Sequence, residues 1–282
     1  MKVVRSPRQL QRILEEERLR KRTVGFVPTM GALHEGHLSL VKAADRENDI
    51  TVVSIFVNPT QFGPGEDYAK YPRVLGADKR LLGKGKVDYL FCPSVRDIYP
   101  PGHATCVTVD GAMARVLCGK FRPGHFQGVA TVVAKLLNIV GPCRLYLGAK
   151  DYQQAAIIRR FVEDLNMNAR VRVMPTVREK DGLAMSSRNR YLGPAERRRA
   201  LALSRALFEL RRDILGKKGT LAFLKARAVR KLKDAVDRVQ YFEIVDPVTL
   251  APLKMVRREM VALTACFVGK TRLIDNVIIS LR

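Results

Sequence analysis

The residues best suited to chemistry are two histidines, His34 and His37, which lie on either side of Gly36. An imidazole ring can donate a hydrogen bond, transfer a proton or ligate a metal ion. If a helix begins near His34, both rings fall on one side of its first turn, and Gly36 leaves room for a flat base. The segment is therefore a candidate nucleotide site, although surface histidines or a zinc site would give the same pattern.

A zinc site would need further ligands, and the only other histidines are His103 and His125. The cysteines are odd in number, scattered, and form no Cys-x-x-Cys pair. This usage argues against a disulfide framework and a structural zinc, and it suits a reducing, cytoplasmic compartment. The cysteines are Cys92, Cys106, Cys118, Cys143 and Cys266.

Apolar segments flank the histidines on both sides. Thr23 to Val27 reads as a buried strand. After the histidines comes a helix whose apolar side contains Leu38, Leu40, Val41, Ala43 and Ala44. A strand, a Gly-containing loop and a helix start together form a typical phosphate cradle, because the N–H groups of a helix N-terminus lack internal partners.

Further polar side chains follow other predicted strands. Ile50 to Val57 is almost entirely apolar, as in a central parallel strand covered on both faces. Asn58 and Gln61 follow it, and polar groups past the carboxyl end of such a strand commonly face the ligand. A role in making the turn is about equally supported for Asn58 and less so for Gln61.

Two later segments carry charge suited to phosphate. Arg144 to Leu147 is predicted to be a strand, and Lys150 follows it at a helix start, where its ammonium group can meet phosphate. The polar stretch from Arg178 to Arg190 holds Ser186, Ser187 and Arg188, a plausible clamp for a polyphosphate leaving group. For Lys150, a solvated surface lysine is the alternative.

The order of elements predicts an α/β fold with a doubly wound parallel sheet, because strands and helices alternate up to about residue 177. Thr105 to Val109 is expected to form an edge strand or hairpin. Beyond the polar stretch, two basic helices and three strands predict a smaller α+β domain. We place the boundary so that residues 1–180 form the first domain and residues 181–282 the second. The expected helices of the second domain are 194–215 and 220–233, and its strands are 239–245, 260–268 and 273–279.

The chain is strongly basic, with a net charge of +24 over 282 residues. Between Glu196 and Arg238 there are fourteen Lys and Arg against five Asp and Glu. We interpret this segment as the solvated faces of amphipathic helices, since no RNA-binding signature accompanies it, and we do not expect a nucleic-acid partner. No apolar run approaches transmembrane length, and the start of the chain has no apolar signal core.

Four segments, in this order and spacing, resemble the pantothenate synthetase (pantoate–β-alanine ligase) family. The His-x-Gly-His pattern by itself is shared with many nucleotidyltransferases. The resemblance covers nearly the whole chain, as far as Leu273 to Asn276. The segments are Val27–Gly31 with His34–His37, Ser54–Pro59 with Gln61 and Phe62, Lys150 and Asp151 with Gln153 and Gln154, and Met185–Asn189.

This resemblance implies a Rossmann-like first domain, a smaller C-terminal lid domain and a homodimer. It also implies that ATP, (R)-pantoate and β-alanine give pantothenate, AMP and diphosphate through a pantoyl-adenylate, with Mg²⁺ present. Two other functions stay open from the residues alone. One is an adenylyltransferase that acts on a phosphate acceptor, and the other is a basic nucleic-acid-binding protein.

The resemblance further implies roles for individual residues. His37 is the catalytic acid, with His34 and Lys150 as its catalytic partners. Gln61 and Gln154 hold pantoate, with Asn58 nearby, and Asp78 lies near the magnesium ion. One departure is Ala149, where the family usually has Glu. The implied ATP contacts are Met30, Gly31, Ala32, Leu33, His34, Glu35, Gly36, His37, Gly148, Ala149, Lys150, Asp151, Val177, Met185, Ser186, Ser187 and Arg188.

Overall fold

The computed structural model describes residues 1–281 and divides into two compact units. The units are not consecutive in the sequence, because two short segments that lie between parts of unit 1 belong to unit 2. Unit 1 contains Met1–Asp110, Arg122–Ala149 and Gln154–Pro175. Unit 2 contains Gly111–Phe121, Lys150–Gln153 and Thr176–Arg282.

Unit 1 is built on a six-stranded sheet with the order β1-β4-β3-β2-β5-β6, and every strand pair in it is parallel. The predicted doubly wound α/β fold is therefore confirmed. Its strands are β1 (Lys2–Val4), β2 (Val24–Thr29), β3 (Ile50–Ile55), β4 (Tyr89–Phe91), β5 (Cys143–Gly148) and β6 (Ala169–Met174). Its helices are α1 (Pro7–Leu19), α2 (Glu35–Glu47), α3 (Leu75–Leu82), α4 (Val95–Ile98), α7 (His125–Val140) and, from Gln154 on, α8 (Tyr152–Asp164), with the short turn η1 (Pro59–Gln61). The turn η2 (Ala149–Asp151) begins in unit 1, and its last two residues belong to unit 2.

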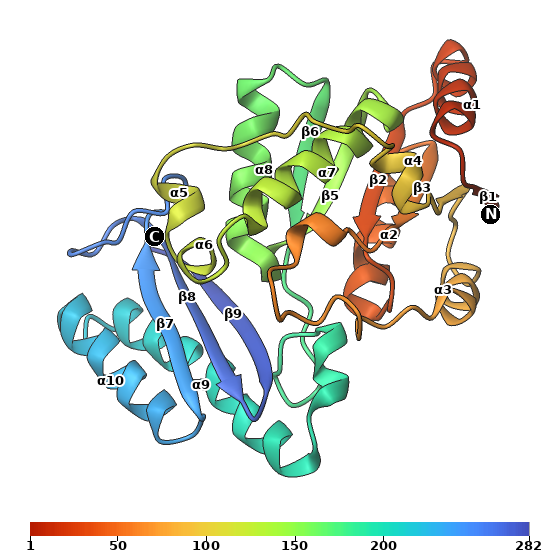
Figure 1. The fold of residues 1–282 in the computed structure, drawn as a ribbon. Helices are drawn as coiled ribbons and strands as arrows, with labels where there is room; N and C mark the ends of the chain where they lie inside the picture. The colour runs from red at the N-terminus through yellow and green to blue at the C-terminus, as the bar shows by residue number, and fades with distance from the viewer. Residues whose placement is uncertain (282) are drawn as a thin grey trace. The chain divides into compact units, whose positions relative to one another are not determined.

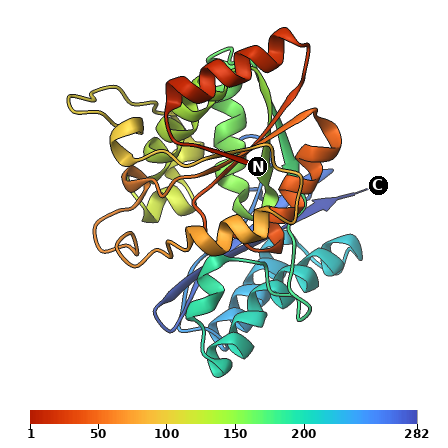
Figure 2. The same cartoon turned by 90° about the vertical axis from the view of Figure 1, so that its right-hand side faces the viewer.

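The central strands β2 and β3 are mostly apolar because both faces of this sheet are covered by helices (Figure 1, Figure 2). Successive side chains of a strand point to opposite faces. In β2, Phe26 therefore joins a core formed with α1, α7 and α8, while Val27 joins a second core formed with α2. The same alternation places Leu145 and Tyr146 of β5 in different cores.

The prediction that Thr105 to Val109 form an edge strand or hairpin is wrong, since these residues pair with no strand among the described residues. They run along α7 instead. The N–H of Val107 donates to Thr131 Oγ1 (2.9 Å), and Thr108 Oγ1 accepts from Gln127 (2.9 Å). Side chains of one helix thus take the hydrogen bonds that a neighbouring strand would have taken. The sheet's edge strands are β6 and β1, and β1 was not predicted from the sequence.

Unit 2 contains a three-stranded antiparallel sheet in the order β7-β8-β9. One continuous apolar core joins this sheet to the two long helices, and the strands alternate little because most of their side chains are buried. The two helices and three strands match the sequence prediction closely. They are α9 (Pro194–Leu215), α10 (Leu221–Lys233), β7 (Arg238–Val245), β8 (Glu259–Val268) and β9 (Thr271–Ser280), and the short elements are α5 (Ala112–Arg115), α6 (Cys118–Phe121) and η3 (Ser187–Tyr191).

Among the described residues, no helix is both long and apolar enough to cross a membrane. The functional division into residues 1–180 and 181–282 stays a prediction.

Candidate active site

The two histidines lie where the sequence places them, between the end of β2 and the start of α2. Strands β2 and β3 pair in parallel, from Val24 with Ile50 to Thr29 with Ile55. The loops that follow them therefore start side by side, at the carboxyl ends of the two strands. His34 is the N-cap of α2, in an extended conformation. Both imidazoles are half-buried, and their ring centroids are 4.1 Å apart.

The histidines cap the helix reciprocally. His34 Nδ1 accepts the N–H of Gly36 (3.2 Å), and His37 Nδ1 accepts the N–H of His34 (3.3 Å). An Nδ1 atom that accepts a hydrogen bond carries no proton, so in each neutral ring the proton is on Nε2. The capping arrangement therefore fixes one tautomer in which each ring has an Nε2–H donor.

The loop before the histidines is held by Asp78 of α3. The Asp78 carboxylate is 2% exposed and accepts the N–H groups of Ala32 (3.0 Å) and Leu33 (2.8 Å). Gly31 and Ala32 both have positive φ, 80° and 52°. This left-handed region favours glycine, and a side chain at Gly31 would approach Asp78 Oδ2 to 3.0 Å. The backbone is thus held in an uncommon conformation by a buried carboxylate.

Several backbone N–H groups of this loop, which the sequence predicts to form a phosphate cradle, already donate hydrogen bonds within the chain. The N–H of Gly31 donates to Thr29 Oγ1 (3.2 Å), and the N–H of His37 donates to the His34 carbonyl (2.8 Å). With those of Ala32, Leu33, His34 and Gly36, six N–H groups of this loop already have acceptors within the chain. These six amides are therefore engaged within the chain, and the two imidazoles lie beside them at the start of α2.

The loop after β3 is organised by Asn58, which is 1% exposed. Its amide nitrogen donates to the Gly128 carbonyl (3.1 Å) and to Gln61 Oε1 (3.1 Å). Its oxygen accepts from Tyr99 Oη (2.8 Å). Gln61 in turn contacts Met30 Sδ through its amide nitrogen (3.2 Å). Gln61 and the histidine loop therefore meet, while Asn58 supports Gln61 from behind.

A basic residue between α6 and α7, Arg122, also supports the Gln61 loop. Arg122 forms a two-point ion pair with Glu66 (2.7 and 2.5 Å) and contacts His125 Nε2 (2.9 Å). Burial acts to raise the pKa of Glu66, but the hydrogen bonds and charge of Arg122 outweigh it, so that pKa lies below its usual value. His125 Nδ1 lies 2.7 Å from the Gln61 carbonyl. Arg122 thus braces the Gln61 loop.

The remaining predicted residues divide between the units. Gly148 and Ala149, at the end of β5, and Gln154 of α8 belong to unit 1. Lys150 and Asp151 belong to unit 2, where Lys150 Nζ lies 3.4 Å from Asp151 Oδ1. Val177 and the segment Met185 to Arg188 also belong to unit 2. In that segment Ser186 Oγ accepts the N–H of Arg188 (3.3 Å) and begins the turn η3.

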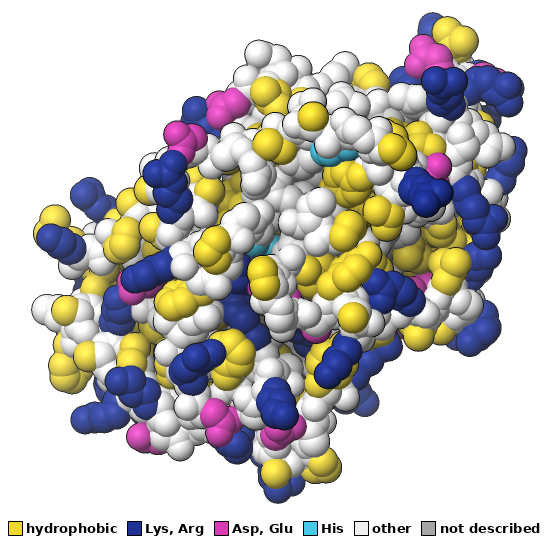
Figure 3. Space-filling model, in the orientation of Figure 1, with side chains coloured by type: hydrophobic (Ala, Val, Ile, Leu, Met, Phe, Trp, Pro, Cys, Tyr) yellow, Lys and Arg dark blue, Asp and Glu magenta, His cyan; other side chains and the backbone are white. Residues whose placement is uncertain are grey.

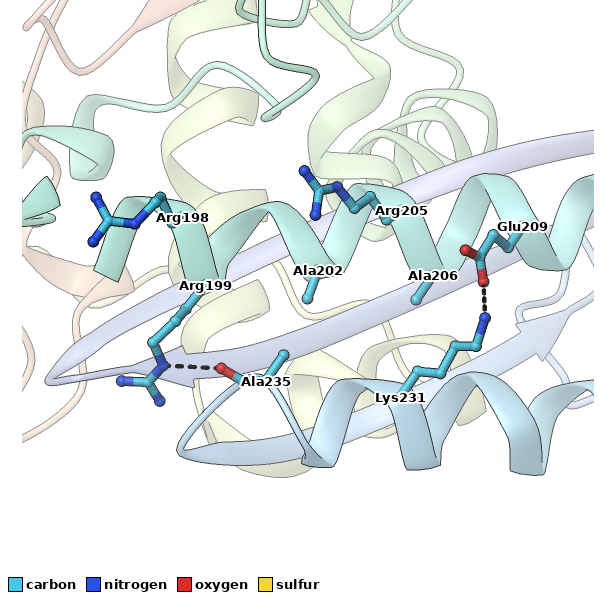
Figure 4. A pocket seen from close by; sticks show the side chains of 8 residues that line it. All are labelled: Arg198, Arg199, Ala202, Arg205, Ala206, Glu209, Lys231 and Ala235. Atoms are coloured by element: carbon cyan, nitrogen blue, oxygen red, sulfur yellow. Dashed lines mark hydrogen bonds and ion pairs between the residues drawn. The ribbon is translucent and has the colours of Figure 1, made fainter. Parts of the chain in front are cut away.

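Unit 2 has a basic groove between α9 and α10, with a volume of about 220 Å³ (Figure 4). Two of its cations are neutralised, since Lys231 pairs with Glu209 (2.5 Å) and Arg199 pairs with Asp237 (2.8 Å). Arg198 and Arg205 stay exposed on α9. None of the residues predicted to contact substrate is among those that line the groove.

Sequence reasoning missed the polar residues that hold these segments in place. Gln153 donates to the carbonyls of Met113 and Val116 (both 2.8 Å) and accepts the N–H of Cys118 (2.9 Å). Asp275 and Asn276 interrupt an apolar strand, and two adjacent polar residues there could have been predicted to have buried partners. Those partners, however, are more than ninety positions away in the sequence. No local spacing rule connects such residues.

The fold and the loop together define a class. A parallel α/β sheet with a His-x-Gly-His segment capping the helix after its central strand is the arrangement of Rossmann-like nucleotide-binding proteins. The comparisons with known proteins then narrow this class. Residues 2–278 match the family model described as pantoate-beta-alanine ligase. The chain belongs to this family, and it is therefore a ligase that joins pantoate to β-alanine to form pantothenate.

Individual relatives agree with this assignment over their full length. The pantothenate synthetase of Thermodesulfovibrio yellowstonii is 51% identical over 99% of this chain and 100% of its own. The crystal structure of pantothenate synthetase from Thermus thermophilus matches with a TM-score of 0.93 and 47% identity over 98% of this chain and 99% of that one. A pantoate-beta-alanine ligase from Francisella tularensis, complexed with beta-gamma ATP and beta-alanine, matches with a TM-score of 0.80 and 38% identity, covering 99% of this chain and 97% of that one.

Proposed function

We propose that the ligation uses ATP as co-substrate and proceeds in two steps through a pantoyl-adenylate. A free carboxylate does not condense with an amine, because its oxygen is a poor leaving group. In the first step the pantoate carboxylate attacks the α-phosphorus, and the bond to the leaving diphosphate breaks. In the second step the neutral β-alanine amine attacks the acyl carbon, AMP leaves, and the amine loses a proton. The ATP analogue in the Francisella relative supports the nucleotide assignment.

His34 and His37 stabilise the charge that develops at the α-phosphate during the first step. The observation that carries this proposal is their reciprocal capping, because it leaves each neutral ring with an Nε2–H donor in a fixed orientation. Preorganised donors of this kind contribute about 10²–10³-fold in rate each. Charge stabilisation needs no full proton transfer, so His37 acts either as a donor or as an acid.

The other predicted residues have complementary roles. Lys150, Ser186, Ser187 and Arg188 neutralise the leaving diphosphate. Gln61 and Gln154 hold pantoate, and Asn58 positions Gln61 through its own hydrogen bond. The remaining contacts to ATP come from Met30, Gly31, Ala32, Leu33, Glu35, Gly36, Gly148, Ala149, Asp151, Val177 and Met185.

A magnesium ion would accompany the ATP phosphates. Both oxygens of Asp78 already accept loop N–H groups, and no cluster of three or more His, Cys, Asp or Glu within residues 1–281 could hold a metal. These residues therefore do not form a metal site by themselves. Mg²⁺ commonly keeps several waters and binds substrate phosphates, which suits a site of this kind. Asp78 near the ion stays a proposal, and no step depends on it.

At the level of the whole protein, we propose a cytoplasmic homodimer whose C-terminal domain, residues 181–282, acts as a lid over the ATP- and pantoate-binding domain, residues 1–180. Exclusion of water gives such a lid a purpose, since the mixed anhydride hydrolyses. Neither a membrane nor a nucleic acid is proposed as a partner.

A matched pair of variants tests the histidine assignment. His37→Asn places an amide oxygen near the Nδ1 position, so it keeps an acceptor for the His34 N–H and removes the Nε2–H donor. His37→Gln places an amide nitrogen near the Nε2 position. We expect His37→Asn to lower the single-turnover rate of diphosphate release by about 10²–10³-fold, and His37→Gln to lose less.

The assay itself separates the competing functions. ATP and pantoate alone should release one diphosphate per site, and AMP should appear with pantothenate only when β-alanine is added. Near-normal diphosphate release by His37→Asn would overturn the role of His37. Transfer of AMP to a phosphate acceptor, without amide formation, would instead support an adenylyltransferase.

A further inference from the structure

Two polar residues lie in the interior of the unit 2 sheet. Asp275 and Asn276 are each 3% exposed and lie in β9, a strand that is otherwise rich in apolar residues. Burial of a carboxylate is costly unless it is paired and hydrogen-bonded. Their partners therefore show what these residues do.

Asp275 is paired with Arg178. The guanidinium donates from Nη1 to Asp275 Oδ2 (2.7 Å) and from Nη2 to Oδ1 (2.9 Å). The Cζ atom of Arg178 lies 4.7 Å from the centroid of the Phe208 ring. Asp275 Oδ1 also accepts the N–H of Asn276 (2.7 Å). This two-point geometry fixes the direction as well as the distance of the pair.

Arg178 also fixes a hairpin in the chain around it. Its Nη1 donates to the Gly182 carbonyl (3.1 Å), and Arg178 pairs with Ala184 in an antiparallel bridge. The N–H of Met185 donates to the Val177 carbonyl (3.0 Å). The hairpin thus begins at Val177 and ends at Met185. The next residues are Ser186, Ser187 and Arg188, which are predicted to contact the diphosphate.

Asn276 extends the same network to the predicted catalytic lysine. Its side-chain nitrogen donates to the backbone carbonyl of Lys150 (2.9 Å). Arg178 Nη2 donates to the backbone carbonyl of Asn276 itself (3.2 Å). One buried ion pair is therefore connected both to Lys150 and to the hairpin that leads to Ser186.

We infer that Asp275, Asn276 and Arg178 are positioning residues for the adenylation step, because they hold Lys150 and the Met185–Arg188 segment in one fixed arrangement. This inference rests on the proposed function, in which those two groups receive the leaving diphosphate. Misplacing a catalytic group by about 1 Å can cost about 10²-fold in rate. A buried ion pair often adds little net stability compared with an apolar replacement, so stability alone gives a weak reason for this one.

The test uses Asn276→Ala in the full-length enzyme, and it measures the two steps separately. Diphosphate release from ATP and pantoate should be slowed by about 10-fold to 100-fold, since the hold on Lys150 is lost. Amide formation from chemically prepared pantoyl-adenylate and β-alanine should stay within about twofold, because diphosphate has no part in that step. Arg178→Lys should give the same split, since one ammonium cannot replace a two-point guanidinium.

A double-mutant cycle with Lys150→Ala connects the effect to the lysine. If Asn276 acts through Lys150, then Asn276→Ala should cause little further loss of the adenylation rate in a Lys150→Ala background. Thr264→Val is the matched control. It removes a buried hydrogen bond to the Tyr241 carbonyl (2.9 Å) at the position opposite Asp275, without touching Arg178 or Lys150.

The outcomes are distinct. An equal loss of both steps, also seen in Thr264→Val, would reduce Asn276 to a purely structural residue and overturn the inference. Fully additive effects in the cycle would mean that Asn276 does not act through Lys150. A normal adenylation rate in Lys150→Ala would instead overturn the proposed role of the lysine itself, and the inference with it.

Discussion

At the scale of single residues, the orientation of the two histidines depends on a buried carboxylate, that of Asp78, which accepts hydrogen bonds from the loop before them. Asp78 makes no predicted contact with the reacting carboxylate, yet its two oxygens hold the N–H groups of Ala32 and Leu33. Ala32 has a positive φ and His34 is extended, and α2 begins directly after His34. The orientation of His34 and His37 thus depends on a side chain more than forty positions away.

This dependence predicts the effect of Asp78→Asn. The amide can accept one loop N–H, but its own NH₂ group faces the other, leaving a buried donor without an acceptor. We expect the free energy of unfolding to fall by about 1–3 kcal/mol, measured by urea denaturation, and the KM for ATP to rise. Asp88→Asn is the control, since Asp88 likewise accepts a backbone N–H, that of Thr51 (2.8 Å), away from the loop. Equal changes in both variants would contradict a special role for Asp78.

At the scale of elements, the Gln61 loop is positioned by its contact with α7. Gly128 lies so close to the loop that a Cβ there would be 2.3 Å from the Thr60 carbonyl oxygen. Asn58 then ties the loop to the same turn of the helix through the Gly128 carbonyl. Glycine is required here for close approach, because the obstacle is backbone and cannot swing away.

Gly128→Ala should therefore move the loop after β3 away from α7. We expect a loss of about 1–3 kcal/mol in the free energy of unfolding, together with a KM for pantoate that rises more than the KM for ATP. Gly76→Ala in α3 is the control, since its added methyl group meets only the end of Arg80, at 3.8 Å. Unchanged pantoate kinetics in Gly128→Ala would show that Gln61 is not positioned in this way.

At the scale of the whole molecule, the net charge of +24 is the property that the ligase function explains least. Dark blue cationic side chains are spread over the visible face, with far fewer acidic ones among them (Figure 3). In the groove between α9 and α10, half of the cations are already paired. We interpret this arrangement, as in the sequence analysis, as a solvated basic surface, and a nucleic-acid partner is not expected.

Charge reversal at the groove tests this interpretation. Arg198→Glu with Arg205→Glu should leave the ligase rate within about twofold, as expected of surface substitutions away from the site. RNA binding should be weak for both the wild type and the variant at about 0.2 M salt, where phosphate contacts are strongly screened. Arg5→Glu with Arg8→Glu changes the net charge equally on unit 1. Tight RNA binding at that salt, lost only in the groove variant, would favour a nucleic-acid function.

The sequence by itself determined most of the long helices and strands, and the resemblance to the family. A run such as Ile50 to Ile55, rich in β-branched residues, is typical of a strand covered on both faces, and Ser6 before Pro7 marks the start of α1. The His-x-Gly-His segment and the later motifs gave the position of the candidate site and its resemblance to a known ligase. These features are local, because they depend on side-chain type and spacing along one stretch of chain.

Only the tertiary structure decided how those residues are held. The partners of Asp78, Arg178 and Asn276 lie on other elements, and hydrogen bonding depends on distances that no spacing along the chain encodes. The segment around Val107 shows the same limit, because its alternating pattern suits a strand but Thr131 of α7 takes its hydrogen bond. Local pattern thus fixes which residues can act, while packing fixes which of them are free to face a ligand.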